Sequence, residues 1–420
     1  MLRTNQKNNG ERTSIAVCEE KKAEMEGQNK DEKDIMIQPT EERDLPFDLI
    51  SEMILTRLPI KSIIRFKSVS KLWYSTLSSH RFAFLHLKFP NPSITESLII
   101  RSDDKFQIMS YENGDIDLFN VEVDFDVGDE SMILVGTCNG LVCFGSTCGR
   151  LFILLNPITR EFRKYLDSEI SNLFTTWYSV GWGFGYLSAV DDYKIVRICK
   201  EWLSTSYMVH IYSFRLDKWR IIDNIVFPYP LYDSRSGIRS SAVLVNETLC
   251  WMGFSGLPGI IISFDLESEM FNKFSHFEVS TLLSYVTSQD ECIDKLLFVV
   301  NGCLSRYDKL LSGDIVTILR SPGVIEEIIL PMDLTKMIYF EKIIGFSRSD
   351  KVFVVCFDND SEELPYLGVI DITWQPLKLT PLMTLEAEHK IEFFSYCASL
   401  ISPNAHVIRT REGRDEHSNI

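Results

Sequence analysis

Several features are absent from this sequence of 420 residues, and each absence excludes a class of protein. No apolar run approaches the roughly 18 residues that a membrane-spanning helix needs, so no membrane-spanning helix is expected. The hydrophilic N-terminus lacks a signal segment, and we expect a soluble protein of the cytoplasm, the nucleus or both. Basic residues are scarce, with 43 Lys and Arg against 59 Asp and Glu, a formal net charge of −16. Since phosphate backbones bind basic faces, nucleic acid is not expected as the main partner.

Metal-ligating and disulfide patterns are also missing. The ten cysteines are scattered, without the paired spacing of a disulfide-stapled domain. Their only cluster is Cys138, Cys143 and Cys148, which lacks both CxxC spacing and a nearby histidine. The seven histidines form no HExxH pair. We therefore expect reduced, buried thiols, no metal and no cofactor.

No catalytic motif is present either. The glycines of "GWGFGY" (181–186) lack a phosphate-loop lysine and a following helix, which favours a tight strand turn over a nucleotide site. "GSTCG" (145–149) lacks the GxSxG spacing of a nucleophile elbow, and "DNDSEE" (358–363) lacks the glycine and distal glutamate of a calcium loop. We predict no catalytic residue, although distant loops could still assemble a site that local motifs do not reveal.

The composition divides the chain into four segments. Residues 1–43 and 404–420 mix charges with few aromatic residues and are predicted to be a disordered leader and tail. Residues 44–88 have helical periodicity. Residues 95–403 change to short β-branched and aromatic runs separated by Gly, Asn, Asp and Pro, which predicts an all-β domain.

The helical segment is apolar on two sides. Pro46 is suited to the first turn of one helix, Pro59 ends it and starts a second, and Ser70 can cap a third. A lone surface helix shows one apolar stripe, and about 43 residues close a core with difficulty, so another surface is expected to cover the second side. On a helical wheel of "LPIKSIIRFKSVSKLWYSTL" (58–77), Ile60, Ile63 and Ile64 oppose Phe66, Val69, Trp73 and Leu77.

The β region carries a repeat in which an apolar strand ends at a turn and a second strand follows. The first turn positions are separated by 57, 52, 54 and 52 residues, and a weaker sixth copy lies at 106–123. A period near 50 is typical of four-stranded propeller blades. An irregular sandwich or barrel whose hairpins repeat by chance is the alternative. The turn positions are Asn156, Ser213, Asp265, Leu319 and Asp371.

One charged stretch exceeds the background. Residues 107–149 contain no Lys or Arg, while 112–130 are rich in acidic residues. Such a run is typical of a solvated edge, and the competing hypothesis is a substrate-binding patch for a basic protein. Its candidate residues are Asp115, Asp117, Glu122, Asp124, Asp126, Asp129 and Glu130.

These motifs resemble a known family. "LPFDLISEMILTRLPIKSIIRFKSVSKLWYSTLSSHRFAFLHL" (45–87) resembles the F-box of plant proteins, and "GTCNGLVCF" (136–144), "LLNPITREFRKYL" (154–166) and "IYSFRLDKWRII" (211–222) resemble successive motifs of the F-box-associated domain. The motif order is also similar to that of S-locus F-box proteins. Ser68 and His80 stand where the family often has Cys and Pro.

The resemblance implies a small all-α F-box module of three helices followed by a large all-β, propeller-like domain with kelch-like blades. It implies a non-catalytic substrate receptor of a Skp–cullin–F-box ubiquitin ligase, in which the module docks on the Skp adaptor, and through it on cullin and RING subunits. A propeller enzyme or glycan-binding protein that uses the module only for assembly is the alternative. The adaptor-binding residues implied are Leu45, Pro46, Leu49, Ile54, Leu58, Pro59, Ile63, Ile64 and Val69.

Overall fold

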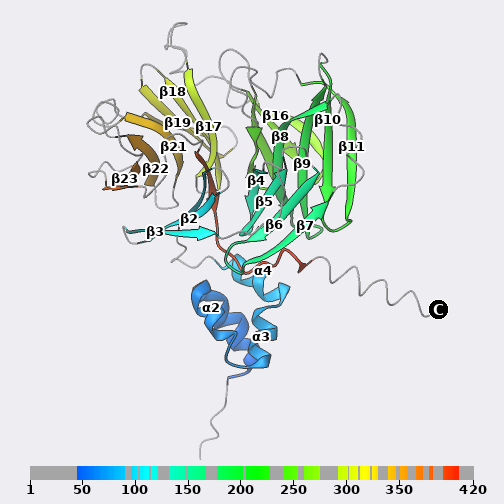
Figure 1. Cartoon of the computed structure of the whole chain (residues 1–420), viewed down its shortest axis with the longest axis vertical. Coiled ribbons are helices and arrows are strands. Elements are labelled where there is room, and N and C mark those ends of the chain that lie inside the picture. Colours follow the sequence, from blue (N-terminus) through cyan, green and yellow to red (C-terminus); the bar gives the residue numbers. More distant parts are fainter. Residues whose placement is uncertain are drawn as a thin grey trace, which may run out of the picture. The chain divides into compact units, whose positions relative to one another are not determined.

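The structure is a computed structural model that describes a helical region and most of the β region (Figure 1). Among the described residues, no helix has the length and apolar character needed to cross a membrane. The predicted leader (1–43) lies outside the described residues, as does most of the predicted tail. The described residues are 45–89, 96–102, 105–112, 115–121, 132–146, 150–166, 177–201, 205–227, 240–253, 260–274, 292–300, 302–310, 313–321, 324–329, 339–346, 351–357, 366–371, 378–381 and 391–405.

The helical module contains one more helix than predicted. Ser79 accepts a hydrogen bond from the backbone N–H of Phe82 at 3.2 Å and caps a separate final helix, so the expected third helix is broken in two. The predicted cap at Ser70 is confirmed, since its hydroxyl accepts from the N–H of Trp73 at 3.2 Å. The elements are α1 (Phe47–Leu49), a π-helical turn η1 (Ile50–Ile54), a 3-10 turn η2 (Leu55–Arg57), α2 (Ile60–Phe66), α3 (Lys71–Leu77) and α4 (His80–Lys88).

A small core holds these helices together. Leu55, Ile63, Leu77 and Phe82 are buried in it. His86 is also buried, and its Nε2 lies 2.8 Å from the backbone oxygen of Leu58, which joins α4 to the segment before α2. Desolvation lowers the pKa of His86, so the neutral ring is favoured in the fold.

The β region forms six sheets from the strands described. Within each sheet the neighbouring strands run antiparallel, apart from β12, which pairs parallel with β8. In sheet order, the first three sheets are β25 (Ile391–Tyr396), β1 (Glu96–Ser102), β2 (Lys105–Glu112), β3 (Asp115–Val121); β4 (Met132–Cys138), β5 (Leu141–Ser146), β6 (Leu151–Asn156), β7 (Glu161–Leu166); and β11 (Lys218–Ile225), β10 (Tyr207–Ser213), β9 (Asp192–Glu201), β8 (Trp177–Leu187), β12 (Ser240–Ser241). The other three are β13 (Val243–Val245), β14 (Thr248–Gly253), β15 (Ile260–Asp265), β16 (Met270–Phe274); β17 (Cys292–Val300), β18 (Cys303–Leu310), β19 (Gly313–Ser321), β20 (Val324–Ile329); and β21 (Tyr339–Phe346), β22 (Lys351–Phe357), β23 (Tyr366–Asp371), β24 (Lys378–Pro381).

The sheets are the blades of a β-propeller. One strand of each sheet contacts the corresponding strand of the next, in the order β4, β8, β13, β17, β21 and β25, and β25 contacts β4 again. The ring is therefore closed, which confirms the predicted propeller and excludes the sandwich. β25 pairs with β1, so the strand nearest the C-terminus completes the blade that begins directly after the helical module.

The sequence repeat corresponds to the hairpin between the third and fourth strands of a blade. Asn156, Ser213 and Asp265 each end a third strand. Each side chain accepts hydrogen bonds from backbone N–H groups of the turn that follows. Four positions later the backbone of each turn has a positive φ, between 52° and 59°. The weak copy at 106–123 is confirmed as a hairpin of the same kind, β2 and β3.

Two details of the repeat region differ from the prediction. In the fourth copy the register shifts between Leu319 and Ser321, and Ser321 pairs with Val324, so Leu319 is not the turn position. The segment 181–186 is not a turn but the middle of β8. A Cβ at Gly183 would lie 2.8 Å from Cδ1 of Leu249, so glycine here permits close packing of the next blade.

Candidate functional site

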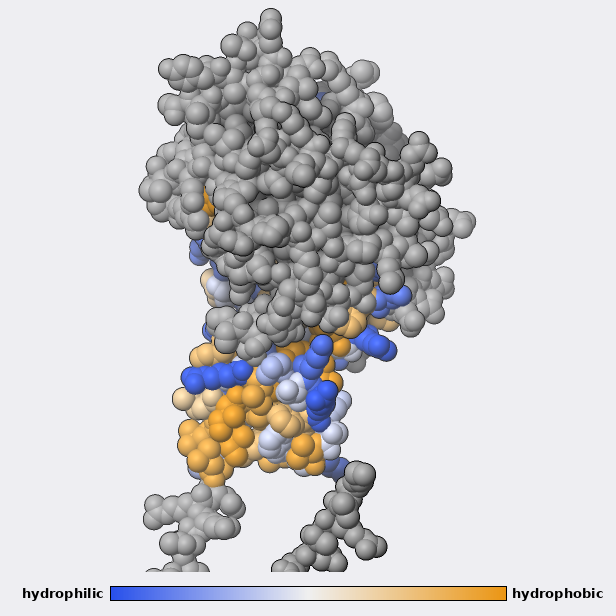
Figure 2. Space-filling view, turned by 90° about the vertical axis from the view of Figure 1, so that its left-hand side faces the viewer, coloured by the Kyte–Doolittle hydropathy of each residue, from blue (hydrophilic) through white to orange (hydrophobic). Residues whose placement is uncertain are grey.

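The helical module exposes a set of large apolar side chains, which we call the apolar face. Their exposed fractions lie between 41% and 60%, although the same helices bury a core. Figure 2 shows apolar side chains gathered on one side of the module. An exposed apolar cluster of this kind marks a protein interface rather than an ordinary surface. The apolar face comprises Leu49, Met53, Ile54, Ile64, Val69, Leu72 and Tyr74.

The nine predicted adaptor-binding residues differ in how far they are exposed to solvent. Leu49, Ile54, Ile64 and Val69 belong to the apolar face, and Leu45, Pro46 and Pro59 are also exposed. Leu58 is half-buried. Ile63 is fully buried in the module core and presents no surface to a partner.

Sequence reasoning grouped Ile63 with Ile64 because both fall on the same side of a helical wheel as Ile60, although neighbouring positions on the wheel differ by about 100°. That step is sufficient to turn Ile63 toward the core and Ile64 to solvent. Met53, Leu72 and Tyr74 were missed. Met53 follows Leu49 by four positions, the spacing of one helix face, and this signal could have found it.

The predicted acidic patch falls mostly outside the described residues. Asp115 and Asp117 belong to β3, whereas Glu122, Asp124, Asp126, Asp129 and Glu130 are not among the residues described. The role of this patch stays a prediction.

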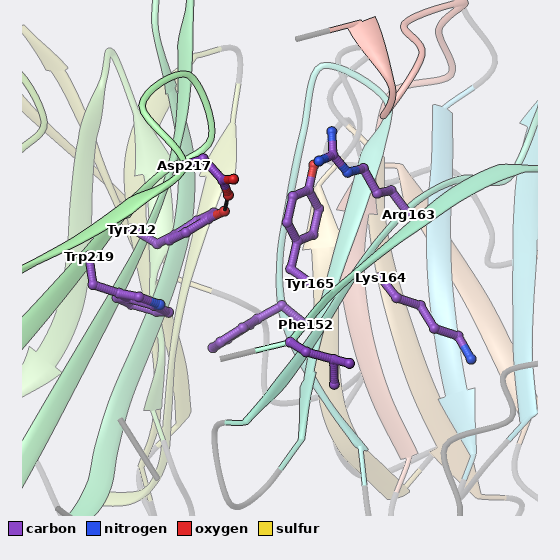
Figure 3. Close-up of a pocket in the computed structure, with 8 residues that line it drawn as sticks. Phe152, Arg163, Lys164, Tyr165, Tyr212, Asp217 and Trp219 are labelled. Atoms are coloured by element: carbon purple, nitrogen blue, oxygen red, sulfur yellow. Dashed lines mark hydrogen bonds between the residues drawn. The ribbon is translucent and has the colours of Figure 1, made fainter. Parts of the chain in front are cut away.

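A second candidate site is a groove of about 210 Å³ between two neighbouring blades (Figure 3). One wall comes from β6 and β7, and the opposite wall from β10, the turn after it and β11. Both β7 and β11 lie at the outer edges of their sheets. The groove is lined by Phe152, Arg163, Lys164, Tyr165, Leu166, Tyr212, Asp217 and Trp219.

Aromatic rings form most of this groove. Trp219 lies 5.6 Å from Phe152 and 5.0 Å from Tyr212, and Tyr165 lies 5.9 Å from Tyr212, measured between ring centroids. Phe152 is buried at the floor, while Trp219 and Tyr165 are half-exposed. The rings form the walls, while polar atoms contribute the larger share of the groove's exposed surface, so a partner side chain that enters meets both rings and polar groups.

Two charged groups lie at the rim. The guanidinium carbon of Arg163 lies 4.6 Å from the ring centre of Tyr165, and the hydroxyl of Tyr212 donates to the carboxylate of Asp217 on the other wall. Desolvation raises the pKa of Tyr165 to about 12 even though Arg163 opposes the shift, so its hydroxyl stays protonated at neutral pH. Figure 3 shows Lys164 directed away from the opposite wall.

The described residues contain no group of three or more His, Cys, Asp or Glu side chains that could hold a metal ion. Desolvation raises the pKa of Cys138 and of Cys250 to about 12. These two thiols therefore stay protonated and are poor nucleophiles.

Comparison with known proteins agrees with the two-part architecture. The F-box domain model matches residues 43–85, and the model of the F-box associated beta propeller domain matches residues 116–295. The F-box/kelch-repeat protein At3g23880 of Arabidopsis thaliana is 30% identical over 290 residues, which cover 64% of this chain and 74% of the relative.

Two further Arabidopsis thaliana proteins are similar over shorter shares of their length. Putative F-box protein At3g10430 is 30% identical, with 54% of this chain and 60% of the relative covered. F-box protein CPR1 is 25% identical, with 62% of this chain and 65% of the relative covered. The chain therefore spans less than two thirds of either of these two relatives. The two matched models and the relative covered to 74% show that this chain belongs to the F-box proteins with an F-box associated β-propeller domain.

Proposed function

We propose that this chain is the substrate-recognition subunit of a Skp–cullin–F-box ubiquitin ligase. The apolar face docks on a Skp-type adaptor, which connects it to cullin and RING subunits, and the propeller captures a target protein for ubiquitination and degradation. The observation that carries the proposal is the apolar face, which lies within the matched F-box model. We place this function in the cytoplasm, the nucleus or both.

The burial pattern supports docking rather than a purely internal role. Ile63, Leu77 and Phe82 already complete a core in which each is at most 3% exposed. Ile64 and Val69 are adjacent or close in sequence to these core positions but remain exposed. Burying a large apolar side chain contributes about 1.5–3 kcal/mol, so covering several of them supplies a substantial part of a binding free energy.

In this role the chain needs no catalytic residue of its own. A receptor accelerates ubiquitin transfer by holding the target close to a charged conjugating enzyme, which raises the effective concentration of the reacting groups. The chemistry then belongs to the other subunits of the ligase.

The test is co-expression of the full chain with a Skp-type adaptor, followed by affinity purification. The variant Leu49→Asp with Ile64→Asp places two carboxylates in an interface that excludes water, and each unpaired buried charge costs several kcal/mol. We expect at least a hundredfold weaker adaptor binding. Met270→Asp is the matched control, because Met270 is 61% exposed on the propeller strand β16.

Thermal melting checks that both variants remain folded. Adaptor that co-purifies with the double variant at the wild-type yield would show that the apolar face is not the docking surface. Ile63→Asp is unsuitable for this test, because Ile63 is fully buried and its replacement would unfold the module.

A further inference from the structure

We propose that the groove between β7 and β10–β11 binds an extended acidic segment of the target protein, with an apolar side chain of that segment inserted between the aromatic walls. This inference rests on the proposed function, because it names the kind of target segment that the receptor would recognise.

The size of the groove favours a peptide side chain over a small-molecule cofactor. Sites for drug-sized ligands and cofactors measure roughly 300–1,000 Å³. The groove is smaller, at about 210 Å³, and it opens at the outer edges of two blades. A space of this size suits one anchoring side chain whose neighbours lie along the rim.

The chemistry of the groove is that of an interface hot spot. Trp, Tyr and Arg are the residue types enriched at such positions, and the groove brings together Trp219, Tyr165, Tyr212 and Arg163. Leu166, at the end of β7, is 81% exposed at the same site. An exposed apolar residue beside a half-exposed aromatic groove gives a partner further apolar surface to cover.

Charge selects an acidic partner. The chain as a whole is strongly acidic, yet the stretches 160–166 and 215–223, which carry six of the eight groove-lining residues, contain six basic and three acidic residues. Of these nine charged residues, Arg163, Lys164 and Asp217 line the groove itself. Arg220 is paired with Glu269 at 2.8 Å, and the carboxylate of Asp217 already accepts from Tyr212. The basic residues are Arg160, Arg163, Lys164, Arg215, Lys218 and Arg220, and the acidic ones are Glu161, Asp217 and Asp223.

Arg163 is the group that would contact a carboxylate of the ligand. Its guanidinium lies over Tyr165 at the rim, where it can donate to an acidic side chain while keeping its ring contact. A phosphate group suits this groove less well. Phosphate sites use clusters of arginines, whereas Arg163 is the one arginine that lines this groove.

The experiment uses the full chain in complex with the adaptor, and also the full chain alone. The probe is an array of nine-residue peptides with a central Leu, Phe or Trp and flanking positions that are Asp and Glu, Lys and Arg, phosphoserine, or Ser. We expect binding to the acidic arm. Arg163→Glu and Trp219→Ala should each weaken that binding at least tenfold, and higher salt should weaken the wild type toward the Arg163→Glu variant.

Matched controls separate the groove from general surface effects. Arg150→Glu makes the same charge change on an exposed residue of the same blade, and Met270→Ala truncates an exposed apolar residue on β16. Both should bind acidic peptides like the wild type. Arg163→Glu changes a side chain at the rim and opens no core cavity, so the proposal stays testable if Trp219→Ala fails to fold.

Several outcomes would overturn the inference. These are stronger binding of the basic or phosphoserine arm, equal binding by wild type and groove variants, and no retention of acidic peptides by a complex that contains adaptor. In the last case the proposed ligase function stands and only the ligand assignment fails. Conversely, acidic peptides bound by a chain that never binds adaptor would support the groove and refute the ligase role.

Discussion

Asn156 donates a hydrogen bond from its side-chain nitrogen to the backbone oxygen of Ile401 at 2.7 Å, although 245 residues separate them in sequence. The same nitrogen lies 3.1 Å from the backbone oxygen of Ser399, while the side-chain oxygen accepts from Ile158 and Thr159. One buried amide therefore shapes a turn of the second blade and holds the segment that follows β25.

We predict that Asn156→Ala lowers the free energy of unfolding by about 3 kcal/mol. The reason is that the backbone oxygens of Ser399 and Ile401 lose their donor, and an unsatisfied buried polar group costs about 1–3 kcal/mol. Urea denaturation followed by circular dichroism measures the change.

Asp265→Ala is the matched control, because Asp265 caps the equivalent turn of another blade and accepts hydrogen bonds from Glu267 and Ser268 within that turn. Its effect should be smaller, about 1 kcal/mol. Equal effects of the two substitutions would show that the bonds to 399 and 401 contribute nothing.

A second prediction concerns the loss of stability at low pH. Desolvation, with Arg197 adding to it, lowers the pKa of buried His210 from 6.5 to about 4. The unfolded chain then binds a proton below about pH 6.5 that the folded chain does not accept until about pH 4. The contribution of His210 to the free energy of unfolding should therefore be constant above pH 6.5. It should fall by about 3 kcal/mol as the pH drops from 6.5 to 4.

Unfolding free energies of wild type and His210→Leu, measured between pH 7.5 and 4.5, test this. The variant should show a shallower fall below pH 6.5, although not a flat profile, because burial also lowers the pKa of His86. Parallel curves for the two proteins would contradict the assignment.

Glycine 183 provides a test of propeller packing. A Cβ at this position of β8 would lie 2.8 Å from Leu249 and 3.0 Å from Ala242, so Gly183→Ala should destabilise the chain by about 1–3 kcal/mol through overpacking. The combined variant with Leu249→Ala should recover part of the loss, because the contacted atom is removed. If Gly183→Ala melts like the wild type, the sheet of β13 to β16 is not packed tightly against β8.

The helical module is predicted to fold poorly by itself. The apolar face lacks cover in the isolated module, and the core is continuous with the propeller through Phe84, whose ring centroid lies 5.3 Å from that of Tyr186. Circular dichroism of residues 40–90 should show weak helix that increases when the adaptor is added. A free fragment with a stable, cooperative melting transition would contradict this prediction.

The propeller could be predicted from sequence because its repeat has a local physical cause. A polar side chain at Asn156, Ser213 or Asp265 caps the turn after the third strand, and this pattern is visible without any contact between blades. The prediction lost its register at Leu319, where the turn position is Ser321 two residues later.

The remaining errors arose where distant contacts decide the structure. The packing of Gly183 against Leu249 and the bonds from Asn156 to the C-terminal segment join parts of the chain that no local pattern connects. The same applies to the groove, whose two walls are contributed by 152–166 and 212–219. Helical periodicity located the apolar surface of the module, but a shift of one residue separates exposed Ile64 from buried Ile63.

The pairing of β25 with β1 also sets a condition on biosynthesis. The ribosome must release residues 391–396 before the first blade has its innermost strand, whereas the helical module emerges some 300 residues earlier. A nascent chain interrupted before this point lacks the strand that closes the ring. Such a product would present the F-box without a closed propeller. If the chain has the proposed ligase function, the product would occupy the adaptor without capturing a target, so premature termination would interfere with the intact protein as well as deplete it.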